Sequence, residues 1–533
     1  MAHLNYTRPK RIIASWTGPE ESINSDPDQI AAALKDLGRD IYLLEKNGKV
    51  VTVSGGEIST SEVGEEGFPV VGLLHALDPA HFGDPGFLSC YNLIYPYMAG
   101  SMANAISGID LVLAMGKAGY LASYGAGGVP PTKLVGAIQE IKKALPDGPY
   151  AFNLIHSPQE IHLEDQTVDL FLEHQIQVIE ASAFLRLTPA VVRYRAGGLS
   201  LDSSGKVVIR NKVIAKLSRP EVAVQFLNPP PDKLLQQLVE SGKITAQQAE
   251  LASSVPMADD ITVEADSGGH TDNRPLVGLL PSITALRDQL QHDNKYPVPV
   301  RIGAGGGIST PYAVLGAFSM GAAYVVTGSI NQACLEAGTS PSVKQALAEA
   351  GAPDIMMAPS ADMFEMGVKV QVLKRGTMFP MRAQKLYDTY ITHDSLEDLS
   401  PKLKKELEEK IFQTSLESIW EECEKFFSER DPDQLTKARQ NPKRKMALVF
   451  RWYLGLATHW GIQGVPERSL DYQIWCGPSM GAFNDWVRGT SLEKAGNRSA
   501  PAIAEQLMHG ASYQLRLQQL SLQGISVPAQ WRR

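Results

Sequence analysis

Cysteine is scarce in this chain, which has four in 533 residues. Cys90, Cys334, Cys423 and Cys476 lie far apart, and no two of them form a C-x-x-C pair. This spacing excludes a zinc ribbon or a thioredoxin motif that a sequence could reveal. Few, scattered cysteines are typical of a reducing compartment, so we expect a cytoplasmic protein.

Long apolar runs and an excess of basic charge are also missing. No stretch approaches the roughly 20 apolar residues that span a bilayer, and the opening "MAHLNYTRPKRIIASW" lacks the apolar centre of a secretory signal. Lys and Arg number 50 against 58 Asp and Glu, a net charge of −8. The basic cluster "NPKRKMAL" near Arg444 is short and is interpreted as a solvated helix end. We therefore predict neither a membrane nor a nucleic-acid partner.

The common nucleotide and metal fingerprints are absent as well. "GAGGGI" fails G-x-G-x-x-G because Ile308 stands at the third glycine, and "GAGGVP" fails because of Pro130. The chain has neither G-x-x-x-x-G-K-[ST] nor H-E-x-x-H. We predict no metal site.

One serine-hydrolase pattern is present, but its context is wrong. "CGPSMG" places Ser479 in G-x-S-x-G, the pattern of a nucleophile elbow. A hydrolase also needs an acid and a histidine downstream, and only His509 follows, in a segment that looks helical. A catalytic serine is therefore disfavoured.

Apolar, β-prone runs alternate with helix-like segments from about residue 91 to residue 340. There are eight such units, which is the count of a (β/α)8 TIM barrel of the α/β class. The runs are continuous rather than alternating, as in a parallel sheet covered by helices. The eight predicted strands lie in "YNLIYPYMAG", "GYLASYGAGG", "YAFNLIH", "QVIEASAF", "NKVIAKLS", "DITVEADSGGH", "VPVRIGAGGG" and "AYVVTGSIN".

Three regions are predicted around this pattern. Residues 1–90 form an N-terminal α+β segment with a hairpin at Asn47-Gly48. Residues 91–340 form the barrel, with a helical insertion at about 228–257 that could serve as a lid or a substrate tunnel. Residues 341–533 are mostly helical and are expected to pack on the barrel.

Glycines follow the seventh and eighth predicted strands, in "RIGAGGGIS" and "VVTGSIN". In barrels the loops after these two strands commonly bind a phosphate through backbone N–H groups. The candidates are Gly305, Gly306, Gly307, Gly328 and Ser329, whose hydroxyl can add a hydrogen bond.

His270 follows the sixth strand directly, in "ITVEADSGGHTDNRP". Three interpretations are open: a metal ligand, a polar residue at a tight turn, or a functional histidine at the active-site end of the barrel. The last is favoured by position, because an imidazole exchanges protons near neutral pH. Asp266 and Asp272 either orient His270 or cap the turn.

These motifs together resemble a known family. The chain is similar to the PfaD family, the trans-acting FMN-dependent enoyl reductases of polyketide and polyunsaturated fatty acid synthases, within the nitronate monooxygenase-like superfamily. The resemblance runs from about residue 85 to 515. It is carried by "AFNLIHSP", "AKLSRPEVA", "EADSGGHTDNRP", "GSINQACLEAGTS", "MAPSADMFEMGVKVQVLKRGTMF" and "DYQIWCGPSMGAFNDWVRG".

The resemblance implies FMN at the mouth of the barrel and His270 as the catalytic residue. Lys216 would support the electron-rich edge of the reduced flavin, and the glycines and Ser329 named above would hold its phosphate. Gly268 would let flavin and substrate approach the backbone. The remaining implied flavin contacts are Met98, Ala99, Gly100, Asn153, Glu264 and Gly269.

The implied activity is reduction of an enoyl thioester on an acyl carrier protein, with NADPH or NADH as hydride donor. The implied partners are that carrier protein and a polyketide or fatty acid megasynthase, and a homodimer is possible. One alternative is a nitronate monooxygenase that oxidises alkyl nitronates with O2. A second is a flavin-binding scaffold without turnover.

Overall fold

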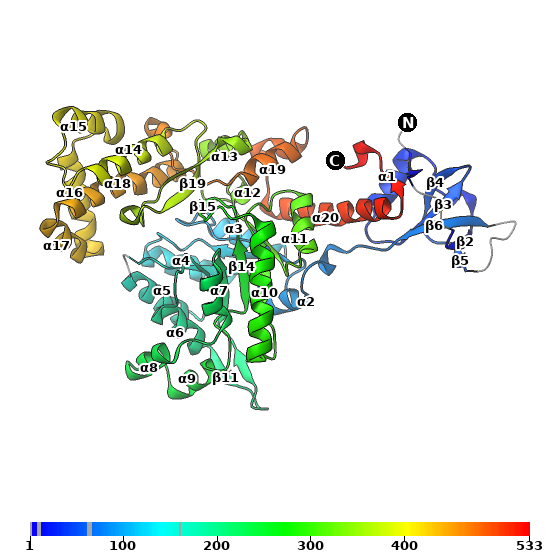
Figure 1. Ribbon diagram of the computed structural model, residues 1–533, viewed down its shortest axis with the longest axis horizontal. Coiled ribbons are helices and arrows are strands. Elements are labelled where there is room, and N and C mark those ends of the chain that lie inside the picture. The colour runs from blue at the N-terminus through cyan, green and yellow to red at the C-terminus, as the bar shows by residue number, and fades with distance from the viewer. Residues whose placement is uncertain (1–2, 8–11, 61–66, 159–160, 533) are drawn as a thin grey trace.

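The computed structural model describes residues 3–7, 12–60, 67–158 and 161–532 (Figure 1). Eight parallel strands close into a barrel, each paired with its neighbours along the chain and the last paired with the first. They coincide with the eight predicted runs, so the TIM barrel is confirmed. The strands are β7 (Tyr97–Ala99), β8 (Leu121–Tyr124), β9 (Ala151–Ile155), β10 (Val178–Ser182), β13 (Lys212–Leu217), β14 (Asp260–Glu264), β16 (Arg301–Gly305) and β17 (Val325–Thr327).

Amphipathic helices cover the outside of the barrel. In α4 (Pro131–Ala144), for example, Leu134, Ala137, Ile138 and Ile141 are buried, as a period of 3.6 residues requires. The other helices that follow a strand are α3 (Ile109–Lys117), α5 (Ile161–Glu173), α6 (Pro189–Gly197), α7 (Pro220–Leu227), α10 (Leu276–Asn294) and α11 (Pro311–Ser319).

The last outer position is filled from far along the chain. Strand β17 is followed only by the short α12 (Ser329–Gln332), and the long α20 (Ala500–Leu522) packs against both α11 and α3. Helix α20 therefore stands where the eighth helix of a barrel belongs. The boundary at residue 340 stays a prediction, although the final helix of the 341–533 region is part of the barrel wall.

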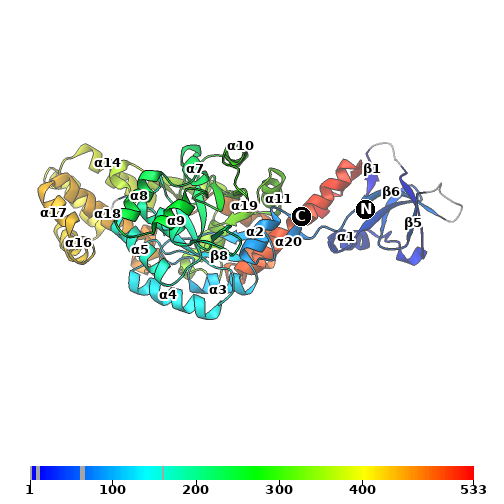
Figure 2. The ribbon, with the colours of Figure 1, turned by 90° about the horizontal axis from the view of Figure 1, so that it is seen from below.

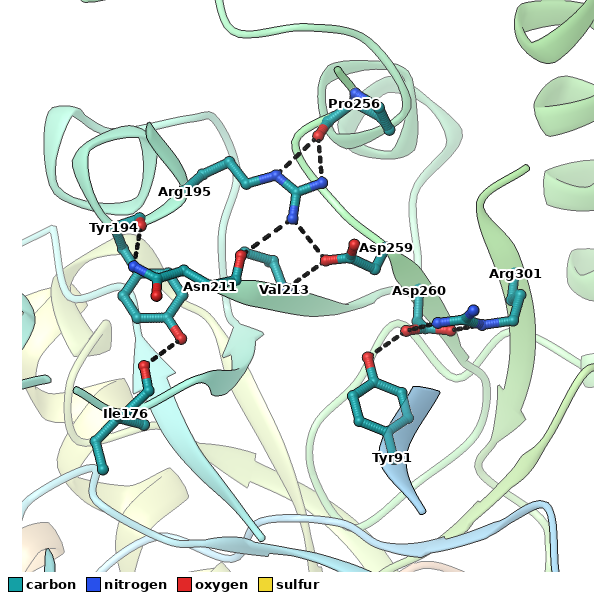
Figure 3. A network of polar contacts seen from close by, with 10 residues as sticks. All are labelled: Tyr91, Ile176, Tyr194, Arg195, Asn211, Val213, Pro256, Asp259, Asp260 and Arg301. Atoms are coloured by element: carbon teal, nitrogen blue, oxygen red, sulfur yellow. Dashed lines mark hydrogen bonds and ion pairs between the residues drawn. The ribbon is translucent and has the colours of Figure 1, made fainter. Parts of the chain in front are cut away.

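Buried charges close the amino end of the barrel (Figure 3). Asp260 is completely buried and accepts two hydrogen bonds from the guanidinium of Arg301, at 2.6 and 2.8 Å, and one from the Tyr91 hydroxyl at 2.5 Å. Nearby, Arg195 donates to Asp259 at 2.7 Å and to the Pro256 carbonyl. Because each charge is paired and hydrogen-bonded, these groups can be buried without a large net penalty.

The helical insertion lies at this same amino end. It forms α8 (Asp232–Glu240) and α9 (Ala246–Ala252), which pack against α6 beside the hairpin of β11 (Leu199–Leu201) and β12 (Val207–Ile209). Figure 1 shows these elements at the bottom, far from the loops at the opposite end of the strands. The interpretation as a lid or tunnel is wrong, because a segment between a helix and the next strand emerges at the amino end.

The N-terminal region contains a five-stranded antiparallel sheet in the order β4-β3-β6-β2-β5. The predicted hairpin at Asn47-Gly48 is present, with φ of 52° and 72°, both in the left-handed region that a tight two-residue turn requires. Helix α1 (Pro27–Lys35) packs on this sheet. The strands are β2 (Ala14–Thr17), β3 (Ile41–Lys46), β4 (Lys49–Val53), β5 (Glu57–Ser59) and β6 (Phe68–Leu74).

The second half of α20 reaches out from the barrel to this sheet (Figure 2). Leu517 and Leu520 belong to the hydrophobic core of the N-terminal region. The fully buried Arg516 donates hydrogen bonds to four backbone carbonyls there. The two-residue strands β1 (Asn5–Tyr6) and β20 (Ile525–Ser526) then pair with each other.

The segment between α12 and α20 covers the carboxyl end of the barrel. Strands β18 (Ile355–Pro359) and β19 (Lys369–Leu373) form a small sheet with β15 (Gly269–His270), which belongs to the barrel loop after β14. The helices are α13 (Pro341–Ala348), α14 (Phe379–Thr392), α15 (Pro401–Leu407), α16 (Leu416–Arg430), α17 (Pro432–Gln440), α18 (Pro442–Gln463) and α19 (Ser479–Val487). Over the described ranges, no helix combines the length and apolar character needed to cross a bilayer.

Candidate active site

A cavity of about 400 Å³ opens at the carboxyl end of the barrel strands. Its size lies within the range of small-molecule sites. Barrel loops form one side, and residues 360–362, α18 and the segment before α19 form the other. The predicted site residues that line it are Gly100, Asn153, Lys216, Glu264, Gly269, His270, Gly305, Gly306, Gly307, Gly328 and Ser329.

Two predicted residues lie behind the cavity wall. Met98 and Ala99 are fully buried in β7, and their side chains pack into hydrophobic clusters. Only Gly100, the next residue, reaches the cavity. Their predicted contact with a ligand through the backbone stays a prediction.

The glycines after β16 and β17 form an open cradle. Gly306 and Gly307 have φ of 82° and 79°, a conformation that favours glycine. A Cβ on Gly307 or Gly328 would meet no protein atom within 4 Å, so both backbones border free space in the cavity. The Ser329 hydroxyl oxygen accepts a hydrogen bond from the Gly477 N–H at 3.0 Å, which leaves its own proton for a ligand. This geometry suits an anion.

An ion pair lies at the ends of the fifth and sixth barrel strands. The ammonium of Lys216 is 3.2 Å from the Glu264 carboxylate, and both side chains are largely buried. Burial lowers the pKa of Lys216, but Glu264 and Glu180 outweigh this and raise it. Lys216 therefore carries its positive charge at the cavity wall.

Glu180 lies under the same wall. Its Oε2 accepts a hydrogen bond from the Ser101 N–H at 2.8 Å, whereas its buried Oε1 has no partner among the described residues. Asn153, one strand away, donates to the Glu180 carbonyl and the Ser182 hydroxyl, which fixes the amide and leaves its oxygen without a donor in the described part of the chain.

His270 is paired with a carboxylate from another part of the chain. Its Nε2 lies 3.1 Å from Asp362 and 3.2 Å from the Ser360 hydroxyl, which itself donates to Asp362. Burial lowers the pKa of His270, but Asp362 outweighs this and raises it. His270 in turn lowers the pKa of Asp362, against the effect of burial. The contact with Asp362 therefore favours the protonated form of the imidazole, and Nδ1 has no partner among the described residues.

The loop that carries Asp362 is anchored to α18. The guanidinium of Arg451 donates to the Ala361 carbonyl at 2.8 Å and lies 3.3 Å from Glu365, which also pairs with Arg444 at 2.6 Å. The helical region therefore holds a part of the site that the barrel lacks.

The two aspartates next to His270 in sequence have other partners. Asp272 accepts two hydrogen bonds from Arg219, both at 2.9 Å, and Asp266 accepts from Asn273 and Gln371. Neither orients His270, so that alternative is wrong. Asp362, 92 residues downstream, was missed because nothing in the local sequence marks it as a neighbour.

Gly268 makes room for another chain segment. A Cβ there would lie 2.9 to 3.0 Å from the Cys476 backbone, and one on Gly477 would lie 3.0 Å from the Gly268 nitrogen. The two glycines let the segment before α19 pack on the barrel loop. Gly268 also lines the cavity, so its predicted role in letting flavin and substrate approach the backbone stays a prediction.

The serine-hydrolase pattern has a structural role. Ser479 begins α19 and lines the cavity, but His509 lies in α20 and is bonded to the Tyr95 hydroxyl at 3.0 Å. Gly481 packs directly against the Ala352 backbone, where a Cβ would not fit. Among the residues that the structure describes, no catalytic triad surrounds Ser479.

A second histidine at the cavity was also missed as a functional candidate. His156 follows β9 and lines the cavity, and its Nδ1 is 2.8 Å from Glu164. Among the described residues, no group of three or more His, Cys, Asp or Glu is arranged to hold a metal ion.

Comparisons with known proteins agree with this geometry. Residues 87–410 match the family model of nitronate monooxygenase, and residues 393–472 match that of the inserted helical domain of acyl-carrier-protein S-malonyltransferase. The enoyl reductase domain of MlnA, from the macrolactin cluster of Bacillus amyloliquefaciens, has a similar solved structure. It is 40% identical with a TM-score of 0.79, over 83% of this chain and 99% of that one.

Longer relatives are similar as well. One component of the polyunsaturated fatty acid synthase of Thraustochytrium is 46% identical over 95% of this chain and 34% of its own length. The Bacillus subtilis polyketide biosynthesis protein PksE is 44% identical over 80% of this chain and 55% of its own. This chain thus spans only a third to about half of these relatives.

The barrel, the glycine cradle at its carboxyl end and the matched family model define a nitronate monooxygenase-like protein. Within that family, the chain belongs to the branch of enoyl reductases of polyketide and polyunsaturated fatty acid synthases, as its motifs indicate.

Proposed function

We propose that the chain binds FMN and reduces the α,β double bond of enoyl thioesters carried on an acyl carrier protein, with NADPH or NADH as the hydride source. The observation that carries the proposal is the arrangement of the cavity. A glycine cradle suited to a phosphate and a histidine whose proton is favoured by its contact with Asp362 open into the same space. The MlnA domain, which is similar along nearly its whole length, is described as an enoyl reductase.

The residues present fit FMN. The backbones of Gly307 and Gly328 border free space that a phosphate would fill. Its oxygens would accept hydrogen bonds from the two backbone N–H groups and from the Ser329 hydroxyl. Lys216 offers a positive charge where the reduced flavin ring would carry negative charge. The unpaired Oε1 of Glu180, which has no partner among the described residues, borders the same wall next to Gly100.

When bound, FMN would supply the hydride that adds to the β-carbon of the enoyl thioester. This addition places negative charge on the thioester oxygen. The imidazolium of His270 would stabilise that charge by a hydrogen bond from Nδ1, because its Nε2 is occupied by Asp362 and Ser360. Ion-paired with Lys216, Glu264 would hold this ammonium in place at the wall.

The proposed partners follow from the relatives. Components of polyunsaturated fatty acid synthases and polyketide biosynthesis proteins contain segments similar to this chain. We propose that the thioester arrives on a carrier protein of such a megasynthase.

Nitronate oxidation with O2 is the second candidate, because residues 87–410 match the family model named for that reaction. It also uses a flavin, so FMN binding alone does not separate the two functions.

In the deciding experiment, purified FMN-loaded protein is mixed without oxygen with an enoyl thioester on a carrier protein and with NADPH or NADH. The mass of the product is then measured by mass spectrometry. A product heavier by two hydrogens is expected. His270→Ala should keep FMN and its yellow colour but lose this reduction. Turnover of alkyl nitronates with O2, together with no gain of mass on the thioester, would contradict the proposal in favour of the second candidate.

A further inference from the structure

His156 is a buried imidazole at the cavity that the steps above do not use. It follows β9, the third barrel strand, whereas His270 follows β14, the sixth. The two histidines therefore approach the mouth of the barrel from different sides. His156 is 5% exposed and still lines the cavity.

Its ring is fixed by a short chain of hydrogen bonds. Nδ1 lies 2.8 Å from Oε2 of Glu164 in α5, and the Thr188 hydroxyl donates to Oε1 of the same carboxylate. The ring also stacks on Phe184, with centroids 5.2 Å apart and planes at 23°. Because an ionised carboxylate accepts only, Nδ1 carries a proton, and Nε2 is the nitrogen left for the cavity.

Glu164 is unusual for its burial. Its side chain is 1% exposed, and within the described ranges His156 is the only basic side chain paired with it. A buried carboxylate is costly unless it is paired and hydrogen-bonded. Here the one ionic partner of the buried carboxylate is an imidazole at the cavity. The same arrangement, a carboxylate bonded to one ring nitrogen, orients the histidine in many active sites.

The proposed reaction needs two protein groups at once. The thioester oxygen must be held while it is charged, and the α-carbon must receive a proton. One imidazole cannot occupy both positions. His270 is suited to the oxygen, because the contact with Asp362 favours keeping its proton.

We propose that His156 is the acid that protonates the α-carbon, with Glu164 as its positioning residue; this inference rests on the proposed enoyl reductase function. In the step, the electron pair of the enolate C=C bond forms a C–H bond with the proton on Nε2. The thioester carbonyl re-forms, and His156 is left neutral with its proton on Nδ1. Solvent then returns a proton to Nε2. The hydride at the β-carbon would be the one that bound FMN supplies, so electrons and protons balance.

His459 is the other imidazole on the cavity lining. It is exposed on α18, and burial together with Lys133 lowers its pKa. No carboxylate within the described residues orients it. It is therefore the rival donor that the test must include.

The test measures the two half-reactions separately. FMN-loaded protein is reduced with NADPH without oxygen and then mixed with an α-methyl enoyl thioester in D2O. We expect His156→Gln to slow reoxidation by the thioester about 100-fold, at the low end of the effect of a positioned acid. Reoxidation by ferricyanide, which needs no carbon protonation, should stay unchanged. The deuterium at the α-carbon should lose its single configuration.

Two further variants control for misfolding and for unspecific effects of replacing a histidine. His156→Gln combined with Glu164→Gln replaces the pair by amides that can bond to each other, so the buried contact survives. The exposed His162→Gln, six residues away, is the neutral control. In protein without FMN, 15N NMR over a series of pH values should show that the neutral His156 keeps its proton on Nδ1 and gains the second one on Nε2, and Glu164→Gln should change this pattern.

The outcomes separate the two proposals. If the unaltered protein never reduces the thioester, the proposed function fails. If the unaltered protein reduces the thioester and the double variant keeps both the rate of reoxidation and the single deuterium configuration, only the role of His156 is refuted and the proposed function stands. The same holds if His459→Gln, rather than His156→Gln, scrambles the deuterium.

Discussion

At the scale of single residues, the charge on His270 depends on one distant carboxylate. Asp362 raises the pKa of the imidazole above its ordinary value of about 6.5, although burial acts in the opposite direction. A group with a raised pKa keeps its proton below that pKa and loses it as the pH rises through it. Activity that needs the imidazolium should therefore extend above pH 6.5.

We predict that Asp362→Asn moves the falling limb of the pH–kcat/KM profile to lower pH. Without the carboxylate, burial and Lys216 lower the pKa of His270, and only the smaller effect of Glu264 raises it. Enoyl reduction should drop more at about pH 8 than at about pH 6, because a smaller fraction of the imidazole keeps its proton at the higher pH. The measurement is kcat/KM from about pH 5 to 9, with the exposed Asp147→Asn as control. A limb that stays in place would contradict this account of His270.

Substitutions at two glycines should affect different properties, FMN binding in one case and stability of the apoprotein in the other. We predict that Gly328→Ala leaves the apoprotein stable, because its Cβ would meet no protein atom within 4 Å, but weakens FMN binding by roughly 10- to 100-fold through loss of close backbone approach. Gly306→Ala should instead destabilise the apoprotein, since φ is 82° and the Cβ would lie 2.7 Å from the Ala265 carbonyl carbon.

Fluorescence titration with FMN and thermal melting of both apoproteins test this pair. Equal FMN affinity in Gly328→Ala and the unaltered protein would place the phosphate elsewhere.

Site residues could be predicted from the sequence where they directly follow a barrel strand. Glycines after the seventh and eighth strands follow from the barrel pattern, and so does the place of His270 after the sixth. Asp362 could not be found this way, because its contact with His270 is made by the folding of a separate region onto the barrel. Asp266 and Asp272 are close to His270 in sequence, which suggested them as the carboxylates that orient it, but closeness in sequence does not ensure contact in the fold.

At the scale of elements, α20 joins two hydrophobic cores, and Arg516 secures one end of it. The guanidinium donates to the carbonyls of Asp36 at 2.7 Å and His75 at 2.8 Å, and to two more. We predict that Arg516→Met, which keeps the aliphatic bulk, destabilises the N-terminal sheet by about 3 kcal/mol, because buried carbonyls lose their donors.

Limited proteolysis and thermal melting measure this effect, with the exposed Arg210→Met as the matched control. Cleavage should concentrate in the N-terminal region. Unchanged protection of that region in Arg516→Met would show that the carbonyls find other donors.

The strands of the barrel were predictable because each is a continuous apolar run flanked by helical segments. Elements that break such rules were not. Strands β18 and β19 pair with each other, and β19 also pairs with β15 of the barrel loop, so they lie outside the strand-then-helix pattern of the barrel. The helical pattern after residue 400 is interrupted at Gln413, which has φ of 60°. The insertion holding α8 and α9 was recognised as helical but assigned to the wrong end.

At the scale of the whole molecule, the cavity is shared between the barrel and the region that covers it, whereas the described N-terminal sheet takes no part in it. We predict that FMN slows amide hydrogen exchange at residues 305–308, 328–332 and 475–479 together. Strands β2 to β6 should exchange as before, because a ligand stabilises only what it contacts or orders.

Hydrogen exchange followed by mass spectrometry, with and without FMN, checks this. Protection confined to the barrel loops would mean that the covering region does not contribute to the cofactor site.

The pairing of Asn5 with Ser526 places the first and last strands of the chain side by side at the N-terminal region. The residues after β20 then turn back along α20, where the Arg532 carbonyl accepts hydrogen bonds from Tyr312 and Gln514. A unit whose first and last strands pair can be inserted into a longer polypeptide at one place. This suits a cassette that recurs inside the longer relatives.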